Sequence, residues 1–184
     1  MRKNGRVGGA FDGRVIHTEH SINYKLRATW LTPEVIRASA RLEQLRSYLS
    51  ERETLDLVDE AEAAGDTVIL VEIDPREGSG VIPREWLAVL QPKGARLEDL
   101  GGVRGENRPE LRRVKALSGV MKRDYAYDLF WLVFPLAGEE GEPLFPDSVD
   151  EAELVVRIYD KVGRVDWEIP PSIRARARSA AAVE

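Results

Sequence analysis

The chain contains no cysteine, and only two of its 184 residues are histidines. The absence of cysteine excludes disulfide bonds, thiolate zinc sites, iron–sulfur clusters and cysteine nucleophiles. Histidine is the side chain that most often moves protons and binds metals near neutral pH, so these roles have few candidates. We therefore predict that the chain holds no cofactor and no metal.

Long apolar runs are also missing from the sequence. No stretch approaches the roughly 18 apolar residues that cross a bilayer. The positively charged start, MRKNGRVGGAFDG, is not followed by the apolar segment of a signal peptide. We predict no integral membrane segment. The sequence is compatible with a cytoplasmic protein and with an exported one whose leader has been removed. It does not determine the cellular compartment.

Positive charge is not in excess, because 27 lysines and arginines stand against 32 aspartates and glutamates, for a net charge of -5. Proteins that bind nucleic acid gain affinity from clustered basic residues, so this balance argues against a nucleic-acid partner. The composition, 43% hydrophobic and 32% charged, is typical of one soluble globular domain. We predict a flexible segment over residues 1–13, a single β-rich domain over 14–171 and a disordered tail over 172–184.

The first part of the domain is predicted to be a strand followed by two helices. Residues 21–30, SINYKLRATW, alternate apolar and polar side chains, as a half-buried strand does. After Thr32 the period becomes helical, Pro33 takes the first helical position, and an apolar stripe follows, formed by Val35, Ala38, Leu42, Leu45 and Leu49. Ser50 and Glu53 match the capping box of a second helix. A helical hairpin is thus predicted at about 33–64.

Two further extended segments follow the hairpin. Residues 67–73, TVILVEI, form a run that is apolar enough for a strand buried on both faces in the centre of a sheet. Residues 81–94 contain Pro83 and Pro92, which cannot donate to a sheet ladder. We therefore expect this second segment at a sheet edge or interrupted by a bulge.

The rest of the chain ends in a predicted β-hairpin. Residues 94–119 are the least ordered interior region by composition, with one short helix at 109–117. Residues 125–136, YAYDLFWLVFPL, have strand composition. Residues 151–159 and 164–169 alternate apolar and polar side chains around turn residues at 160–163. They predict a hairpin with one face exposed to water.

About six strands with one helical hairpin favour an antiparallel arrangement, because the alternation of strands and helices that marks parallel sheets is absent. We predict an α+β, mainly β fold: an antiparallel β-sandwich of immunoglobulin-like or C2-like character with an inserted helical hairpin. The alternative is a single antiparallel sheet with helices on one face.

His17, His20 and Ser79 are the residues from which an enzyme could be built. The two histidines are three positions apart in an extended pattern, so they point to opposite faces and do not form a metal site by themselves. Ser79 lies between glycines but does not match the G-x-S-x-G pattern of a nucleophile elbow. A small hydrolase or metal-dependent enzyme using these residues and loop carboxylates is our alternative function.

The loop after the central strand is the preferred candidate for binding. Asp74, Arg76, Glu77 and Ser79 lie between two apolar segments, and Trp86 follows in a segment without clean alternation. Trp86 is therefore the tryptophan expected at a surface, whereas Trp30 and Trp167 fall on apolar strand faces and are expected in the core. We predict a non-enzymatic module that binds a protein, a glycan or its own copy, with an edge strand as a possible route to homo-oligomers.

Overall fold

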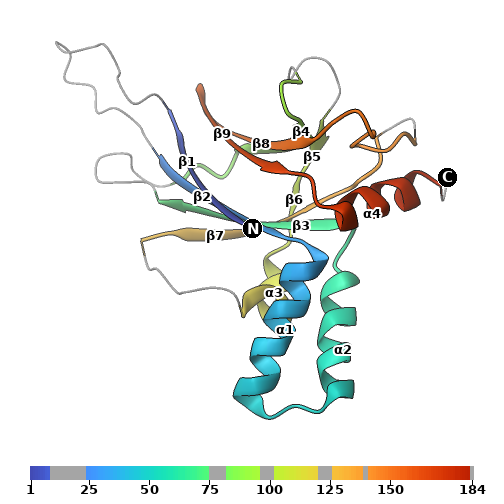
Figure 1. The fold of residues 1–184 in the computed structure, drawn as a ribbon. Coiled ribbons are helices and arrows are strands. Elements are labelled where there is room, and N and C mark those ends of the chain that lie inside the picture. Colours follow the sequence, from blue (N-terminus) through green and yellow to red (C-terminus); the bar gives the residue numbers. More distant parts are fainter. Residues whose placement is uncertain (9–23, 75–81, 96–101, 120–125, 139–140, 183–184) are drawn as a thin grey trace.

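The computed structural model describes residues 1–8, 24–74, 82–95, 102–119, 126–138 and 141–182. Within them the chain forms two antiparallel sheets and several helices (Figure 1). The first sheet has the order β1 (Arg2–Val7), β2 (Tyr24–Leu31), β3 (Thr67–Asp74), β7 (Asp128–Phe134) and β6 (Glu106–Asn107). The second has the order β5 (Val103–Arg104), β4 (Leu87–Pro92), β8 (Glu151–Ile158) and β9 (Lys161–Glu168). The helices are α1 (Pro33–Ser47), α2 (Glu51–Glu62), η1 (Pro109–Arg113), α3 (Lys115–Ser118) and α4 (Pro171–Ala181).

Both sheets contribute to one apolar core. The alternation of β2 buries Tyr24, Leu26, Ala28 and Trp30, and these side chains cluster with the inward residues of β8 and β9. Trp30 and Trp167 are both in this core, as the sequence predicted. The coarse prediction of an α+β fold with antiparallel sheets and a helical hairpin is therefore confirmed.

The edges of the two sheets approach each other closely. On one side, β1 runs beside β9, and a Cβ placed on Gly163 would come within 2.7 Å of the Arg6 carbonyl oxygen. On the other side, β5 continues into β6 through Gly105. This one segment therefore contributes a strand to the second sheet and then a strand to the first. Over the residues described, β1 thus lies against the edge of β9, while β5 pairs with two residues of β4 and β6 with two residues of β7.

A second apolar cluster lies on the outer face of the first sheet, under α1 and α2 (Figure 1). Pro33 begins α1 and the Ser50–Glu53 capping box begins α2, as predicted. The residues of α1 that are buried in the structure are not those of the apolar stripe predicted from the sequence. Its buried residues all lie in the first half of the helix: Pro33, Ile36, Ser39 and Ala40. Because α1 then leaves the sheet, the leucines further along have no surface of this cluster to pack on.

The two ends of the chain are more ordered than we predicted. Residues 2–7, expected to be flexible, pair with β2 along a full antiparallel ladder despite having little apolar content. Residues 171–181, expected in a disordered tail, form α4. Ile173 and Ala177 lie one turn apart on α4 and are fully buried. Arg174 and Arg176 pair with Asp150 and Glu62, so this basic cluster anchors the helix.

Two local predictions are corrected by the sheet topology. β4 is not an edge strand, since it pairs with β5 and β8, and Pro92 is accommodated because it is the last residue of the strand. The terminal hairpin turns at residues 159–160 rather than 160–163, because Ile158 pairs with Lys161. Tyr159 therefore takes the left-handed conformation at the tip, with φ 53°.

Candidate functional site

Most of the loop and both of the histidines singled out from the sequence lie outside the described residues. This applies to His17, His20, Arg76, Glu77 and Ser79. Asp74 and Trp86 are described, and they lie in different places. Asp74 ends β3, whereas Trp86 directly precedes β4 in the second sheet.

Asp74 belongs to a set of cross-strand ion pairs on the outer face of the first sheet. It is 8% exposed and accepts a hydrogen bond of 2.9 Å from Lys25 Nζ, in the register that pairs the two residues. Glu72, two residues earlier, lies within 3.3 Å of Arg2 and 4.0 Å of Arg27. These carboxylates are already occupied by neighbouring cations, which suits a role in joining β1, β2 and β3.

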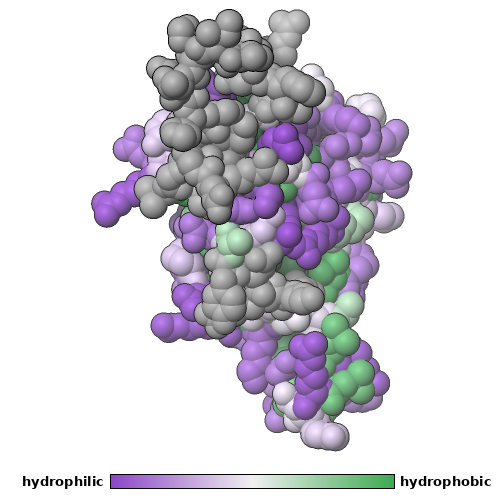
Figure 2. All heavy atoms as spheres, turned by 90° about the vertical axis from the view of Figure 1, so that its left-hand side faces the viewer, coloured by the Kyte–Doolittle hydropathy of each residue, from purple (hydrophilic) through white to green (hydrophobic). Residues whose placement is uncertain are grey.

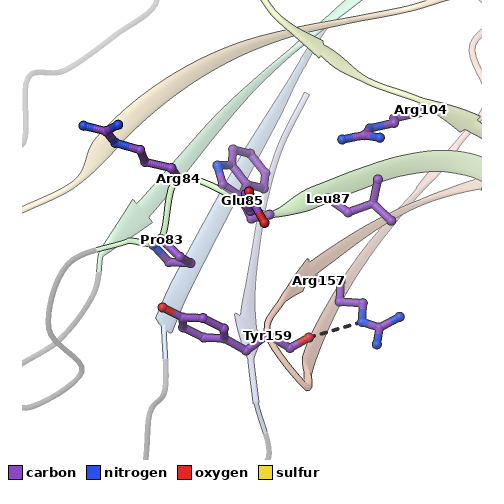
Figure 3. A pocket seen from close by; sticks show the side chains of 8 residues that line it. Pro83, Arg84, Glu85, Leu87, Arg104, Arg157 and Tyr159 are labelled. Atoms are coloured by element: carbon purple, nitrogen blue, oxygen red, sulfur yellow. Dashed lines mark hydrogen bonds between the residues drawn. The ribbon is translucent and has the colours of Figure 1, made fainter.

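Trp86 lies beside an open hollow of about 930 Å³. The hollow is formed where the segment before β4 meets β5 and the tip of the β8–β9 hairpin (Figure 3). Its lining combines three arginines with aromatic and apolar side chains: Pro83, Arg84, Glu85, Trp86, Leu87, Arg104, Arg157 and Tyr159. We call this the arginine hollow.

Strand pairing positions three of its lining residues. Leu87 of β4 lies opposite Arg157 of β8 in the antiparallel register. Arg104 belongs to β5, opposite Val89 of β4. Arg157 Nε also donates a hydrogen bond of 3.2 Å to the carbonyl oxygen of Tyr159, which holds this guanidinium beside the hairpin tip (Figure 3). Part of the rim is thus built on paired strands, and the rest comes from the segment before β4 and the hairpin tip.

The arginine hollow carries a local excess of positive charge on an acidic chain. Arg84, Arg104 and Arg157 form no ion pair with any of the residues that the structure describes, and Glu85 is the one carboxylate in the lining. In Figure 3 the three guanidinium groups stand at separate points of the rim and do not converge on one spot. This spacing suits several anionic groups better than a single small anion.

Aromatic residues form part of the same wall. The ring of Trp86 packs edge to face against Phe130, with centroids 4.8 Å apart and an interplanar angle of 68°. Trp86 is half-buried, whereas the other three tryptophans are at most 3% exposed. Tyr159 is 59% exposed at the hairpin tip. Apolar ligand atoms could therefore pack on these rings next to the arginines.

A second, smaller hollow of about 330 Å³ shares Arg104 with the first. Its carboxylates have partners already. Asp66 accepts a hydrogen bond from the backbone N–H of Leu136 at 2.9 Å, and Glu106 pairs with Arg108 at 3.1 Å. Because both carboxylates already have partners, we regard this hollow as part of the junction between the two sheets.

Neither a metal centre nor a membrane helix is found in the part of the chain that the structure describes. No group of three or more acidic, histidine or cysteine side chains there could hold a metal ion. None of the helices described has both the length and the apolar character needed to cross a bilayer.

The sequence pattern singles out Trp86 but not its neighbours in the hollow. Arg84, Arg104 and Arg157 are spread over more than 70 positions, and each resembles an ordinary surface arginine. Tyr159 does not stand out either, because the pattern places the hairpin turn one residue too late.

Comparisons of the chain with protein-family models, curated proteins and solved structures gave no match.

Proposed function

We propose that this protein is a non-enzymatic binding domain whose arginine hollow takes an acidic segment of a partner protein. The observation that carries the proposal is the set of three arginines around one open hollow, none of them paired with a carboxylate among the described residues. A guanidinium group binds a carboxylate through two parallel hydrogen bonds. Carboxylates from a partner would supply these missing acceptors.

The shape of the hollow favours an extended chain over a small molecule. Sites for small ligands are enclosed and bury most of the ligand. Here the hollow is open, and its charges are distributed around the rim (Figure 3). A peptide with carboxylates at intervals can reach several arginines, while its apolar side chains pack on Pro83, Trp86 and Leu87.

The rival functions have less support. The candidate enzyme residues His17, His20 and Ser79 lie outside the described residues, so no geometry favours a hydrolase or a metal-dependent enzyme. A glycan would use the aromatic rings, but a neutral glycan would leave the arginines without an anionic partner.

The immunoglobulin-like or C2-like character of the fold remains a proposal too. Two antiparallel sheets on one core support it. The close approach of β1 to β9 and the continuous β5–β6 segment show that the two sheets also meet at their edges.

Tryptophan fluorescence tests the proposed function, because Trp86 is the least buried of the four tryptophans. The probe is a short peptide that alternates glutamate and leucine, and the control peptide has glutamine in place of glutamate. We expect a saturable change with the acidic peptide that weakens as salt is added.

The arginines are tested with variants in the same assay. Replacing Arg104 and Arg157 by glutamine should weaken binding by about tenfold or more, which corresponds to roughly 1.4 kcal/mol. Arg52→Gln, on α2 and outside the hollow, is the matched control and should bind as the wild type does. Equal responses to both peptides, or full binding by the double variant, would contradict the proposal.

A further inference from the structure

The helical hairpin of α1 and α2 projects from the outer face of the first sheet, away from the arginine hollow (Figure 1). Its far part exposes large hydrophobic side chains. Leu42 is 47%, Leu45 60%, Tyr48 94% and Leu55 62% exposed. Figure 2 shows hydrophobic residues gathered along one side of this projecting part. Exposed apolar groups that lie together mark interaction surfaces in folded proteins.

The apolar residues of α1 and the turn after it follow a heptad pattern. Val35, Ala38, Leu42, Leu45 and Leu49 are separated by alternating steps of three and four residues. We call this row the hairpin seam. Within α1 such spacing places Val35, Ala38, Leu42 and Leu45 in one line, which is the seam through which two helices pack in coiled coils and bundles. Leu49 follows the left-handed Tyr48 that ends the helix.

Apart from Val35, which packs against the cluster on the first sheet, the hairpin seam is not the face that α1 uses inside the chain. Ile36 and Ala40 are buried in the cluster on the first sheet, whereas Ala38, Leu42 and Leu45 are exposed. One helix therefore carries two apolar faces. The first packs on its own domain, and the second has no contact surface in the described part of the chain that would bury it.

The two helices of the hairpin differ in charge. α1 contains three arginines and two glutamates, while α2 contains six carboxylates and one arginine. On α2, Glu51, Asp56, Asp59 and Glu60 form no ion pair with any described residue. On α1, Arg46 likewise has no ion-pair partner among them. The hairpin thus presents a basic helix beside an acidic one, both with unused charge.

We propose that the hairpin seam is the docking surface for a second copy of this chain, and that the two hairpins form an antiparallel four-helix bundle. A two-fold arrangement places the seam of each α1 against the other and brings the arginines of α1 next to the acidic α2 of the second copy. The second copy then buries the apolar side chains of the seam and also supplies charges opposite to those of each helix. Charge complementarity within one hairpin is what selects a second copy over an unrelated partner.

The expected dimer is weak because the hairpin is short. A helix of 15 residues is about 22 Å long, so we expect the bundle to bury less than the roughly 800 Å² per partner of a standard interface. We expect a dissociation constant in the micromolar range.

Sedimentation velocity over a range of concentrations tests the proposal. The wild type should pass from monomer to dimer between about 1 µM and about 1 mM. Leu45→Glu places a charge in the seam and should keep the protein monomeric, while Val162→Glu, at a 37% exposed position of β9, should dimerise as the wild type does. Thermal unfolding by circular dichroism checks that both variants fold.

A charge exchange tests whether the partner on the hairpin seam is a second copy of this chain. In one variant Arg41 and Arg46 are replaced by glutamate, and in the other Glu51 and Asp56 are replaced by lysine. Each variant alone places like charges across the interface and should dimerise at least tenfold more weakly than the wild type. The mixture restores opposite charges at both contacts, so it should form heterodimers. A wild type that remains monomeric throughout, a dimer that survives Leu45→Glu, or a mixture no more associated than its components would overturn the proposal.

Discussion

Trp30 of β2 and Trp167 of β9 lie with ring centroids 5.5 Å apart and an interplanar angle of 58°, and they join the two sheets through the core. Each indole N–H has a partner that fixes its ring. Trp30 Nε1 donates to Thr67 Oγ1 at 2.8 Å, and Trp167 Nε1 donates to the Met1 carbonyl oxygen at 3.2 Å. The pair therefore depends on a neighbouring strand and on the first residue of the chain.

Replacing Thr67 by valine should destabilise the protein, because the buried indole N–H of Trp30 loses its acceptor. An unsatisfied buried donor costs about 1–3 kcal/mol. Urea denaturation measures this loss. Thr29→Val, on the half-buried outer side of β2, is the control and should change stability by less than about 0.5 kcal/mol. A Thr67→Val protein as stable as this control would show that the hydrogen bond is unimportant.

Gly163→Ala should force β1 and β9 apart. The added Cβ would lie 2.7 Å from the Arg6 carbonyl oxygen and 2.7 Å from Val7 Cγ2. Overpacking of this kind costs roughly 1–3 kcal/mol, and the melting temperature should fall by several degrees, since about 1 kcal/mol shifts it by 2–4 °C in a chain of this size. Glu168→Ala, at an exposed position of the same strand, should leave the melting temperature nearly unchanged. Equal melting curves for the two variants would mean that the sheet edges are not in close contact.

Lys93 links β4 to the β8–β9 hairpin and sets the titration of Asp166. Its Nζ donates to Glu151 at 2.8 Å and to Asp166 at 2.9 Å, and the bond from Lys93 lowers the pKa of Asp166 below its ordinary value of 3.8. A carboxylate whose pKa is lowered by folding stabilises the fold above its ordinary pKa, and this contribution is lost as the pH falls through the folded value.

In Lys93→Gln the pKa of Asp166 should therefore rise, and the variant should unfold at a higher pH than the wild type during acid titration. Carbon-13 NMR of the carboxyl groups measures the first effect directly. Lys161→Gln is the control, because Lys161 pairs with Asp160 at 3.3 Å and should leave the Asp166 titration as it is. An unchanged pKa in Lys93→Gln would show that the bond does not persist in solution.

Ile173 should prove to be part of the core although it lies in the segment that the sequence predicted to be disordered. Its side chain is fully buried, in the first turns of α4. Truncation of a buried isoleucine to alanine costs about 2–5 kcal/mol. Chemical denaturation of Ile173→Ala tests this, with Arg178→Ala, whose side chain is 61% exposed, expected to cost far less. Similar stabilities would support the disordered tail instead.

The parts of the fold that the sequence predicted well are those with a strong local signal. Tyr24, Leu26, Ala28 and Trp30 alternate without interruption, so the inner face of β2 was readable directly. The Ser50–Glu53 capping box placed the start of α2 through a contact between residues three apart. These features depend on neighbours in the chain and need no tertiary information.

The features that were missed depend on distant partners. β1 is held by its ladder with β2 and carries few apolar residues, so its composition resembled a flexible end. The spacing of apolar residues in α1 indicates an apolar stripe, but it does not show which face of the helix packs on the first sheet. That face depends on where the helix departs from the sheet. The arginine hollow joins segments around residues 84, 104 and 157, and only the sheet register brings them together.

Mapping of the bound acidic peptide by NMR tests the central claim most directly. The backbone and indole amide signals of the nitrogen-15 labelled protein are followed while the glutamate–leucine peptide is added. The proposed function predicts that the largest shifts occur at Trp86, Leu87, Arg104, Arg157 and Tyr159, and that the signals of α1 and α2 stay in place. Shifts confined to other surfaces, or none at any peptide concentration, would contradict it.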